Sequence, residues 1–440
     1  MGNVKKKILL LSTGDVNGAY EAIYKLGYSF IDQGHTVSML VKHKTRNEEF
    51  IVQYIEKQEK KSIPPIAVRV FKKIKNKLER KMGHRPYSIH FNDKYLFISK
   101  NETTENISIE NAISQIGFIP DFIITGMTNG FMNSTDLLNF HKFTQAKVYN
   151  ITVDMNHFTG GCHYAWDCEG YIKGCDEKCP AIVGEIGRDT AKINFETKLK
   201  NAQEGKFQII SGSGWTLKQA KESKIYKEQK VFYNINSLID TKLFNAKNRD
   251  VAKRIFGFEE SKFYILAGSQ SANDPRKGFS YFMEALKILE TELTIEQKSK
   301  IVVLVVSRDA PQEFERLSFE KQKIDYITDY RLLVILYQAI DLFVNASIED
   351  SGPMMVSEAL ACGTPVVGFD MGVVNNMVIN DYNGYKAMLK NSYDLALGIK
   401  KMLSLTVNEY NLYSKNAISQ IHEYSSFEFA TKIFNEIINT

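Results

Sequence analysis

Short apolar runs alternate with amphipathic stretches along this chain, which is the pattern of an α/β protein. The apolar run at 5–12 predicts a buried strand, a glycine-containing turn at 13–19 leads into a helix that ends near residue 33, and 36–41 predicts a second strand. This β-α-β beginning is typical of a Rossmann-like domain. Later strands of the same sheet are predicted at 121–125, 148–153 and 207–211, the last of them followed by a helix from Leu217.

A second α/β unit is predicted to begin near residue 240. Its expected strands are 264–267, 301–306, 342–345 and 366–369, and its expected helices are 278–290, 330–339 and 354–362. The final segment, 427–438, repeats apolar residues at helical spacing and predicts a terminal helix. No internal repeat and no low-complexity linker separates the halves. We therefore expect two closely joined domains, 1–235 and 236–419.

Composition narrows the class of protein. The chain has 440 residues, of which 44% are hydrophobic and 24% charged, as in ordinary water-soluble domains. No apolar run approaches the roughly 20 residues that span a bilayer. The apolar run after the basic N-terminus is short and turns at Thr13 and Gly14, which argues against a signal peptide, so we expect a cytoplasmic protein. The net charge of +5 is too small to indicate nucleic-acid binding.

One segment is far more basic than the rest. Between Arg69 and Lys81 the chain carries seven basic residues and one acid, Glu79. Apolar side chains recur every four residues, at Val70, Ile74 and Leu78, as on one face of a helix. The segment therefore predicts a basic amphipathic helix that contacts an anionic membrane surface, or, as the alternative, a solvated surface helix docked on its own domain.

The segment 349–367 carries two carboxylates, Asp350 and Glu358, on either side of the Gly-Pro pair at 352–353. Gly352 and Pro353 disfavour regular secondary structure, so Asp350 is expected in a loop and Glu358 inside the helix that follows. Backbone N–H groups at a helix start can hold an anion, which suits the mouth of a nucleotide-binding α/β domain. The simpler alternative is a βαβ unit in which Asp350 is only a favourable N-terminal charge.

The whole string, Glu-Asp-Ser-Gly-Pro-Met-Met-Val-Ser-Glu-Ala-Leu-Ala-Cys-Gly-Thr-Pro-Val-Val, resembles the donor-site signature of GT-B glycosyltransferases of the family-4 type. In that family the first carboxylate lies by the donor sugar and the second holds the nucleotide ribose, which implies these roles for Asp350 and Glu358. The family more often has Glu at the first position, and Glu349 is an alternative. The resemblance also implies donor-binding positions at Ser351, Gly352, Pro353, Met354 and, in a later glycine loop, Gly372.

A second motif, Asn-Asp-Pro-Arg-Lys-Gly at 273–278, follows a predicted strand and precedes a predicted helix. A mobile lysine charge, an arginine fork and helix-start N–H groups together suit a pyrophosphate. Alone, the six residues would be interpreted as a basic turn. The family resemblance extends here, however, and implies Lys277 first and Arg276 second as contacts of the donor diphosphate. The chain contains no Asp-x-Asp, which favours this cationic site over a divalent metal.

A third region, 153–164, resembles a segment of one bacterial subgroup of the family, through Asp154 and the string Thr-Gly-Gly-Cys-His-Tyr. The family histidine before the aspartate is Val153 here. In the family, that histidine contacts the donor sugar. In this chain the contact is therefore assigned to His163 or His157, or to the backbone alone. A histidine in such a place is also commonly structural.

Four of the five cysteines, Cys162, Cys168, Cys175 and Cys179, fall within this part of the chain. Clustered thiols in a cytosolic protein favour a structural zinc site over disulfides, and four thiolates would leave no open position for catalysis. Reduced free thiols are the alternative. Cys362, inside the predicted donor helix, is expected to be a packing residue.

The resemblance implies a GT-B fold: two Rossmann-like domains facing each other across a cleft, with the segment 420–440 crossing back onto the first domain. It also implies a retaining glycosyltransferase of bacterial surface polysaccharide or lipopolysaccharide synthesis that needs no catalytic cofactor. The family turn at 17–19 adds Gly18 to the donor-binding residues. The partners would be a nucleotide sugar and a glycan or lipid-linked acceptor. The alternatives are a GT-B sugar-nucleotide epimerase and a non-catalytic scaffold that binds through its thiol cluster.

Overall fold

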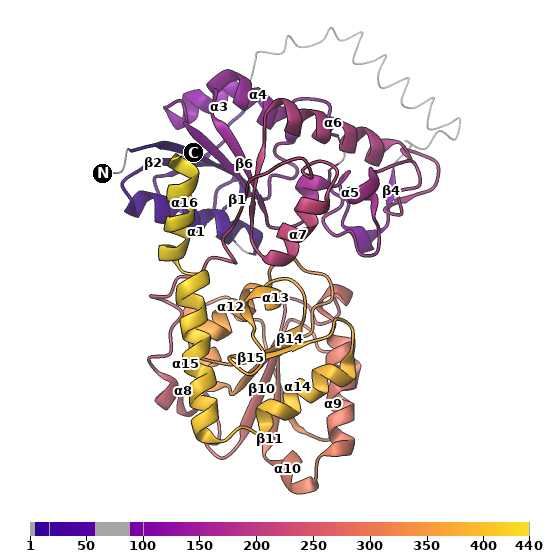
Figure 1. Ribbon diagram of the computed structural model, residues 1–440, viewed down its shortest axis with the longest axis vertical. Coiled ribbons are helices and arrows are strands. Elements are labelled where there is room, and N and C mark those ends of the chain that lie inside the picture. Colours follow the sequence, from indigo (N-terminus) through magenta and orange to yellow (C-terminus); the bar gives the residue numbers. More distant parts are fainter. Residues whose placement is uncertain (1–4, 17, 58–88, 100, 440) are drawn as a thin grey trace, which may run out of the picture. The chain divides into compact units, whose positions relative to one another are not determined.

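The computed structural model describes residues 5–16, 18–57, 89–99 and 101–439 (Figure 1). Contacts divide the chain into two compact units, and the division is not a single cut in the sequence. The first unit contains 1–150, 155–208 and 222–229, and the second contains 151–154, 209–221 and 230–440. The chain forms two parallel sheets, as the sequence predicts, and each unit contains most of one of them. Residues 209–211 and 232–234 pair in the first sheet but group by contacts with the second unit.

The first sheet has seven strands in the order β3-β2-β1-β5-β6-β8-β9. Its centre, β1, pairs in parallel with β2 on one side and with β5 on the other, and it is buried from its second residue onward. The strands are β1 (Lys7–Gly14), β2 (Thr36–His43), β3 (Ile51–Gln53), β5 (Phe122–Thr125), β6 (Lys147–Thr152), β8 (Gln208–Ser211) and β9 (Phe232–Asn234).

Helices connect these strands, and they begin and end at typical capping residues. The helix α4 (Ser134–Thr144) begins at a capping box in which Asn133 and Asp136 each bind the other's backbone N–H. The helix α3 (Ile109–Ile116) ends at Gly117 in the left-handed conformation. The remaining helical elements of this part are α1 (Ala19–Asp32), η1 (Asp93–Tyr95), η2 (Asn156–Phe158), α5 (Gly170–Lys173), α6 (Thr190–Glu204) and α7 (Gly214–Glu222).

The second sheet has six strands in the order β12-β11-β10-β13-β14-β15, and every neighbouring pair is parallel. Alternate residues of the buried strands enter different clusters: Val303 and Val305 of β11 face one core, while Val302 and Leu304 face the other. The strands are β10 (Phe263–Gly268), β11 (Ile301–Val306), β12 (Glu320–Ile324), β13 (Leu342–Asn345), β14 (Val366–Phe369) and β15 (Gly384–Ala387).

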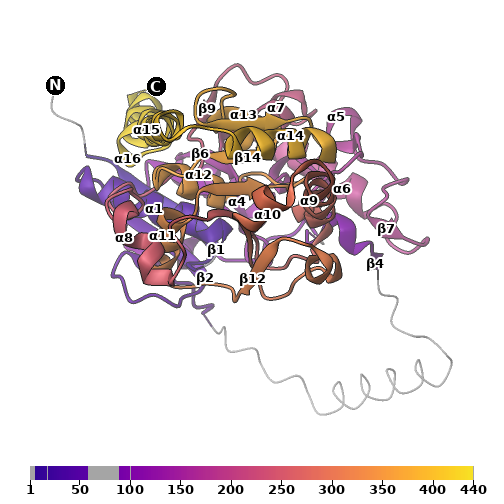
Figure 2. The ribbon, with the colours of Figure 1, turned by 90° about the horizontal axis from the view of Figure 1, so that it is seen from below.

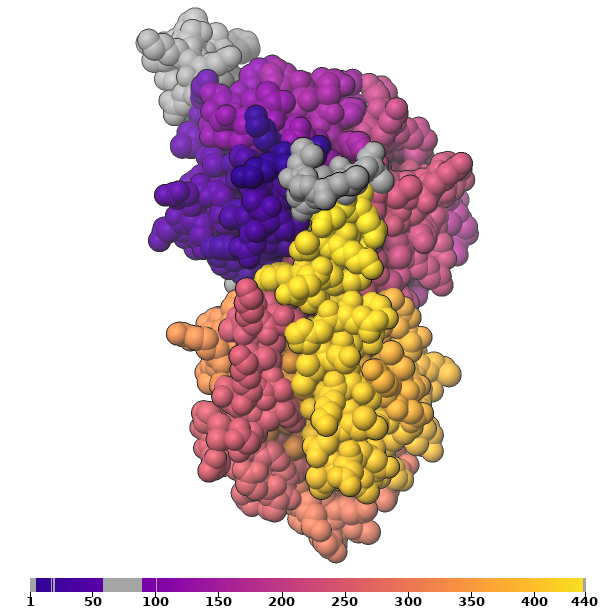
Figure 3. Space-filling model, turned by 60° about the vertical axis from the view of Figure 1, so that its left-hand side comes forward, coloured from indigo at the N-terminus to yellow at the C-terminus, as the bar shows by residue number. Residues whose placement is uncertain are grey.

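Helices cover both faces of this second sheet, which is why its strands are apolar on both sides. Figures 1 and 2 show α8 (Arg249–Phe256) on one side and α9 (Phe279–Glu292) and α14 (Ser392–Leu403) on the other. Figure 3 shows the yellow helix α15 (Val407–Tyr424) lying lengthwise on the surface of this unit. The other helical elements are η3 (Pro275–Lys277), α10 (Ile295–Ser299), η4 (Gln312–Arg316), α11 (Tyr330–Ala339), α12 (Met354–Ala361), α13 (Val374–Met377) and α16 (Phe427–Asn439).

Several predicted boundaries need correction. Strands β3, β9, β12 and β15 were not predicted, and 207–211 is not the last strand of the first sheet, because β9 follows it. Two of these strands have three residues, and β12 is a polar sequence, Glu-Lys-Gln-Lys-Ile, at a sheet edge, so apolar periodicity does not reveal them. Helix α7 begins at Gly214 rather than at Leu217.

Two further expectations are not decided by this fold. The basic segment 69–81 lies outside the described residues. The terminal helix α16 groups by contacts with the second unit, and its crossing onto the first domain stays a prediction. Among the helices that the structure describes, none combines the length and the apolar character of a membrane span.

Candidate functional site

The second sheet changes its winding direction between β10 and β13. From β10 the strand order continues outward through β11 and β12, and from the neighbouring β13 it continues the other way through β14 and β15. The loops that follow these two strands lie at the carboxyl edge of the sheet, where open α/β proteins bind ligands. Lys277 follows β10 and Asp350 follows β13, so the topology alone brings the two predicted motifs together.

Backbone contacts fasten the two loops to each other. The backbone N–H of Ile348 donates to the carbonyl oxygen of Arg276 at 2.8 Å. Gly278 has a φ of +63°, and a Cβ there would lie 1.9 Å from the carbonyl oxygen of Ala346. Only glycine fits this close approach without a shift of the backbone. Asp274 caps η3 by accepting from the N–H of Arg276 at 3.0 Å.

The ε-ammonium of Lys277 forms an ion pair with the carboxylate of Asp350. The side chains are 24% and 11% exposed, so the pair is mostly buried but still reaches solvent. Burial alone would raise the pKa of Asp350; the charges of Lys277 and Arg276 and the N–H of Gly352 outweigh it and lower that pKa. Asp350 is therefore a carboxylate at neutral pH, and its charge balances that of Lys277.

The neighbouring predicted residues are placed around this pair. Arg276 pairs with Asp274 at 2.5 Å between Nη2 and Oδ2. Gly352 donates its N–H to Asp350 Oδ1 at 3.2 Å. Gly372 has a φ of +53°, and a Cβ there would lie 3.0 Å from Cδ of Pro353, so the glycine loop packs directly on the 350–353 loop. Ser351 is buried, and Met354 begins α12.

Glu358 lies in α12, one turn beyond the helix start, and is buried. Its Oε2 accepts a hydrogen bond from the hydroxyl of Tyr337, in α11, at 3.0 Å. Burial first and the charge of Glu358 second raise the pKa of Tyr337 far above its usual value, so this hydroxyl remains a donor. Tyr337 thus holds one oxygen of the predicted ribose-binding carboxylate in a fixed position.

The predicted residues of the N-terminal half lie on separate elements. Gly18, with a φ of +47°, immediately precedes α1 in the loop after β1, at the point where the first sheet reverses its winding between β1 and β5. Asp154 is buried. His163 is only 1% exposed, and its Nε2 lies 2.9 Å from Nδ2 of Asn129. His157 is partly exposed and its Nε2 lies 3.2 Å from the carbonyl oxygen of Gly126.

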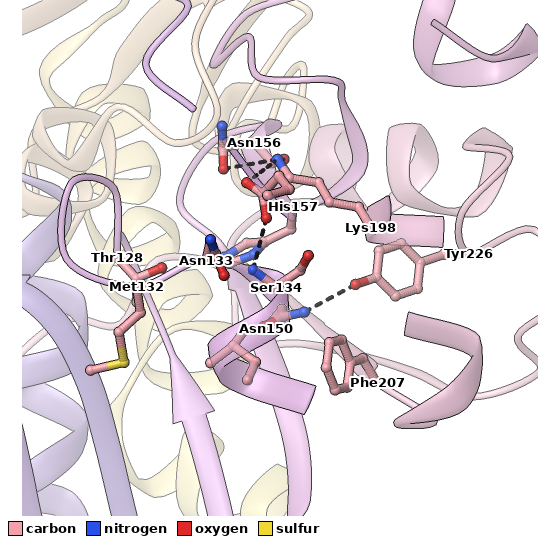
Figure 4. A pocket seen from close by; sticks show the side chains of 12 residues that line it. Thr128, Met132, Asn133, Ser134, Asn150, Asn156, His157, Lys198, Phe207 and Tyr226 are labelled. Atoms are coloured by element: carbon pink, nitrogen blue, oxygen red, sulfur yellow. Dashed lines mark hydrogen bonds and ion pairs between the residues drawn. The ribbon is translucent and has the colours of Figure 1, made fainter. Parts of the chain in front are cut away.

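Figure 4 shows a small polar cavity of about 20 Å³ in the first unit, lined in part by His157. Lys198 approaches Glu102 at 3.4 Å, with side chains only 5% and 3% exposed. Lys198 also donates to the carbonyl oxygen of Asn156 at 2.7 Å, while Glu102 accepts the N–H of Ser134, at the start of α4, at 2.8 Å. A cavity of this size suits one ordered water rather than a sugar, so we interpret it as part of the scaffold.

The cysteines are free thiols, with Cys162 buried and Cys168, Cys175 and Cys179 half-buried. In the part of the chain that the structure describes, no three side chains of His, Cys, Asp or Glu meet closely enough to hold a metal ion as they stand. The predicted zinc site is therefore not preformed. Cys362 is buried in the core around α12, where the sequence places a packing residue.

Some important residues were not predicted from the sequence. Tyr337 lies in an apolar helical stripe and looks like ordinary core, and only its distance from Glu358 reveals its role. Glu102 and Lys198 are far apart in the sequence, and each resembles a surface charge. Asp15 could have been noticed: it follows the first strand, and its Oδ2 accepts the N–H groups of Thr45 and Arg46 at 2.8 and 2.9 Å.

The second half of the chain is similar in sequence to known glycosyltransferases. Residues 248–420, which lie in the second unit, match the family model described as glycosyl transferases group 1. Over 166 residues the chain is 29% identical to the N,N'-diacetylbacillosaminyl-diphospho-undecaprenol alpha-1,3-N-acetylgalactosaminyltransferase of Campylobacter jejuni. This match covers 37% of the chain and 42% of the relative, so the chain spans about two fifths of that protein's length.

Solved structures share the fold over nearly the whole chain. Sucrose-phosphate synthase of Thermosynechococcus elongatus superimposes with a TM-score of 0.64 at 13% identity, covering 99% of this chain and 98% of its own. HepE of Anabaena, in complex with UDP and glucose, gives a TM-score of 0.61 at 14% identity, covering 99% and 100%. The predicted architecture of two Rossmann-like halves, as in GT-B glycosyltransferase structures, is thereby confirmed.

The hydrogen bond from Tyr337 to Glu358 supplies a first prediction. Tyr337→Phe should lower the free energy of unfolding by roughly 1–3 kcal/mol, because a buried carboxylate oxygen loses its donor. Urea denaturation of the purified chain measures this change. The matched control is Tyr326→Phe, which removes a hydroxyl from a ring that is 40% exposed and should change stability by less than about 0.5 kcal/mol. Equal stability of the two variants would contradict the role given to Tyr337.

Proposed function

We propose that this protein is a retaining glycosyltransferase that moves a sugar from a nucleotide-sugar donor to a glycan or lipid-linked acceptor. The observation that carries the proposal is the Lys277–Asp350 pair at the winding reversal of the second sheet. It lies in a domain matched by the glycosyl transferases group 1 model, and Glu358 follows it on α12. A cation, a carboxylate and a helix start converge there as a nucleoside diphosphate sugar requires.

The proposed chemistry relies on electrostatic stabilisation. The bond between the sugar's anomeric carbon and the diphosphate oxygen breaks, and a bond from that carbon to the acceptor hydroxyl oxygen forms. The proton of the acceptor hydroxyl passes to the departing diphosphate. Lys277 and Arg276 stabilise the negative charge that develops on the diphosphate, and no metal or cofactor is required for this. Since Lys277 is already neutralised by Asp350, donor binding must share or exchange that ion pair.

The other residues have supporting roles in this proposal. Glu358, fixed by Tyr337, accepts hydrogen bonds from the ribose hydroxyls. Asp350 and the backbone of 351–354 contact the donor sugar together with Gly372. From the N-terminal half of the chain, we assign Gly18 to the donor phosphates, and Asp154 and His163 to the reacting sugar. His163 acts through the placement of its segment, because its ring is buried against Asn129.

Two alternatives predict different products from the donor alone. A GT-B sugar-nucleotide epimerase would convert the donor without an acceptor, and a non-catalytic scaffold would leave it untouched. The proposed transferase hydrolyses the donor slowly and transfers sugar rapidly only when an acceptor is present. Incubation of the chain with a panel of nucleotide sugars, followed by chromatography of the products, separates the three outcomes. Thermal-shift measurements with the same panel identify the preferred donor.

Loss of the Lys277 charge should weaken the diphosphate site. Lys277→Ala removes a charge-assisted contact worth roughly 1.5–3 kcal/mol, which corresponds to about a 10- to 100-fold fall in turnover or donor affinity. Donor-hydrolysis kinetics measure the change, with circular dichroism to verify folding. Lys287→Ala, an exposed lysine of α9, is the matched control and should leave the kinetics unchanged. A folded Lys277→Ala chain with full activity would remove Lys277 from the site.

The two carboxylates should separate nucleotide binding from sugar transfer. Glu358→Gln should weaken the binding of UDP itself, by roughly 1.5–3 kcal/mol if a charged hydrogen bond to ribose is lost. Asp350→Asn should keep UDP affinity within a few-fold and reduce transfer, since its proposed partner is the sugar. Calorimetric titration with UDP, and with ADP and GDP if UDP does not bind, measures the first effect. The reverse pattern would show that the two roles are exchanged.

A lipid-linked acceptor is favoured by the Campylobacter jejuni relative, whose name specifies a diphospho-undecaprenol substrate. A structure of similar fold, WaaG, is described as involved in lipopolysaccharide biosynthesis. These two similarities support our proposal that the protein acts in bacterial surface polysaccharide synthesis, in the cytoplasm at the inner face of the membrane. The basic amphipathic sequence between Arg69 and Lys81 is the proposed contact with anionic lipid.

This placement predicts salt-sensitive membrane binding. Each Lys or Arg near an anionic surface contributes about 1 kcal/mol, and the attraction is screened over roughly 10 Å at about 0.1 M salt. The chain should co-sediment with anionic vesicles, less so as salt rises, and little with neutral ones. Changing Lys72, Lys73, Lys75 and Lys77 to Glu should abolish this while donor hydrolysis continues.

The control for membrane binding is an equal charge reversal elsewhere, at the exposed residues Lys230, Lys242, Lys247 and Lys287. This control should still co-sediment if the position of the basic residues matters. Loss of binding in both variants would indicate an unspecific charge effect. Equal co-sedimentation of the protein with neutral and anionic vesicles would contradict the proposed lipid contact and favour the alternative, a solvated surface helix.

A further inference from the structure

A small part of the first unit has little regular structure of its own. Segments 89–98 and 160–183 are joined by a two-stranded sheet, β4 (His90–Phe91) with β7 (Ile182–Val183), and by one bridge between Phe97 and Cys162. The only described helix within 160–183 is the four-residue α5. Small folds of this kind depend on a cross-link or a metal, because their core is too small to order the chain.

Four cysteine side chains lie in or against the small apolar core formed by segments 89–98 and 160–183. Cys162 is buried in its apolar cluster with Phe97 and Ile182, and Cys168, Cys175 and Cys179 pack against the same cluster. The thiol groups of Cys162 and Cys179 are hydrogen-bonded to each other. A Cβ added at Gly170 would lie 3.4 Å from Sγ of Cys168 and 3.3 Å from Sγ of Cys175, so these two sulfurs flank one α-carbon.

Backbone amides surround the sulfurs with hydrogen-bond donors. The N–H of Gly170 donates to Sγ of Cys168 at 3.4 Å. The backbone of Gly160 hydrogen-bonds Cys175, and the backbones of Ala181 and Ile182 hydrogen-bond Cys179. Donors of this kind stabilise anionic sulfur, and they orient and tune the ligands of metal sites.

We propose that Cys162, Cys168, Cys175 and Cys179 bind one structural zinc ion as four thiolates. Zn–S bonds of about 2.3 Å in a tetrahedron hold the sulfurs about 3.8 Å apart, a spacing compatible with the hydrogen-bonded Cys162–Cys179 pair. Cys168 and Cys175 must move toward Cys162 and Cys179 to complete the site. This movement explains why the structure shows no preformed group of metal ligands among its described residues. Each thiol releases its proton as its bond to zinc forms, and no oxidation is involved.

The zinc would also fix a segment that the proposed function uses. Cys162 is followed directly by His163, whose backbone N–H lies 3.2 Å from the carbonyl oxygen of Tyr95 and whose carbonyl oxygen accepts the N–H of Met155 at 3.1 Å. Anchoring Cys162 therefore holds 155–164 in place. This consequence depends on the proposed function, but the zinc site itself does not, so metal content and activity are tested separately.

Metal analysis of the full chain, purified without chelator, tests the site directly. We expect about one zinc per chain. Cys175→Ser should lose most of the zinc, while Cys362→Ala, the matched control, should keep it because Cys362 lies in the core around α12. If Cys175→Ser does not fold, the unchanged chain serves instead: a strong zinc chelator should lower its melting temperature by roughly 5 °C or more, and added zinc should restore it.

Trp166 provides a local optical signal. Its Nε1 donates to the carbonyl oxygen of Lys94 at 2.7 Å, and its ring packs against the same cluster. The chain has two tryptophans, so a Trp215→Phe background reports on Trp166 alone. Its emission should shift when zinc is removed and recover when zinc is added. Absence of zinc with five titratable thiols, a disulfide found by mass spectrometry, or iron in place of zinc would each overturn the proposal.

Discussion

The ion pair between Lys277 and Asp350 is the interaction on which the proposed donor site depends. It joins the loops after β10 and β13, and the same loops are fastened by the backbone contact between Ile348 and Arg276. The charges of Lys277 and Arg276 hold Asp350 in its ionised form despite its burial. The pair still reaches solvent, so the cation is accessible to the diphosphate of the proposed donor.

The site also requires that some positions have no side chain. Gly278 and Gly372 both have positive φ, and each brings backbone close to the neighbouring loop. Charge and shape are therefore set by the same short stretches of chain: the cation lies beside Gly278, and Asp350 and Pro353 lie against Gly372. A larger residue at Gly278 would displace both loops and with them both members of the ion pair.

Sequence reasoning predicted the two Rossmann-like halves because their central strands are continuous apolar runs. It singled out Lys277 in one short motif and Asp350 and Glu358 in another, and the fold brings Lys277 and Asp350 together. It missed β3, β9, β12 and β15, which are short or polar and are defined by pairing with a neighbour rather than by their own pattern. It also missed Tyr337, since a tyrosine in an apolar helix acquires a function only through the carboxylate that faces it. Contacts between distant segments, such as Glu102 with Lys198, cannot be obtained from local periodicity.

The buried pair of Glu102 and Lys198 constrains how this protein can change over generations. Loss of either charge leaves the other isolated in the interior, at a cost of roughly 3–5 kcal/mol, which is a large part of the total stability of a typical domain. Joint replacement by two apolar residues of similar volume is nearly neutral by comparison. Descendants of this sequence are thus expected to keep both residues or to exchange both, so the two positions should vary together although 95 residues stand between them.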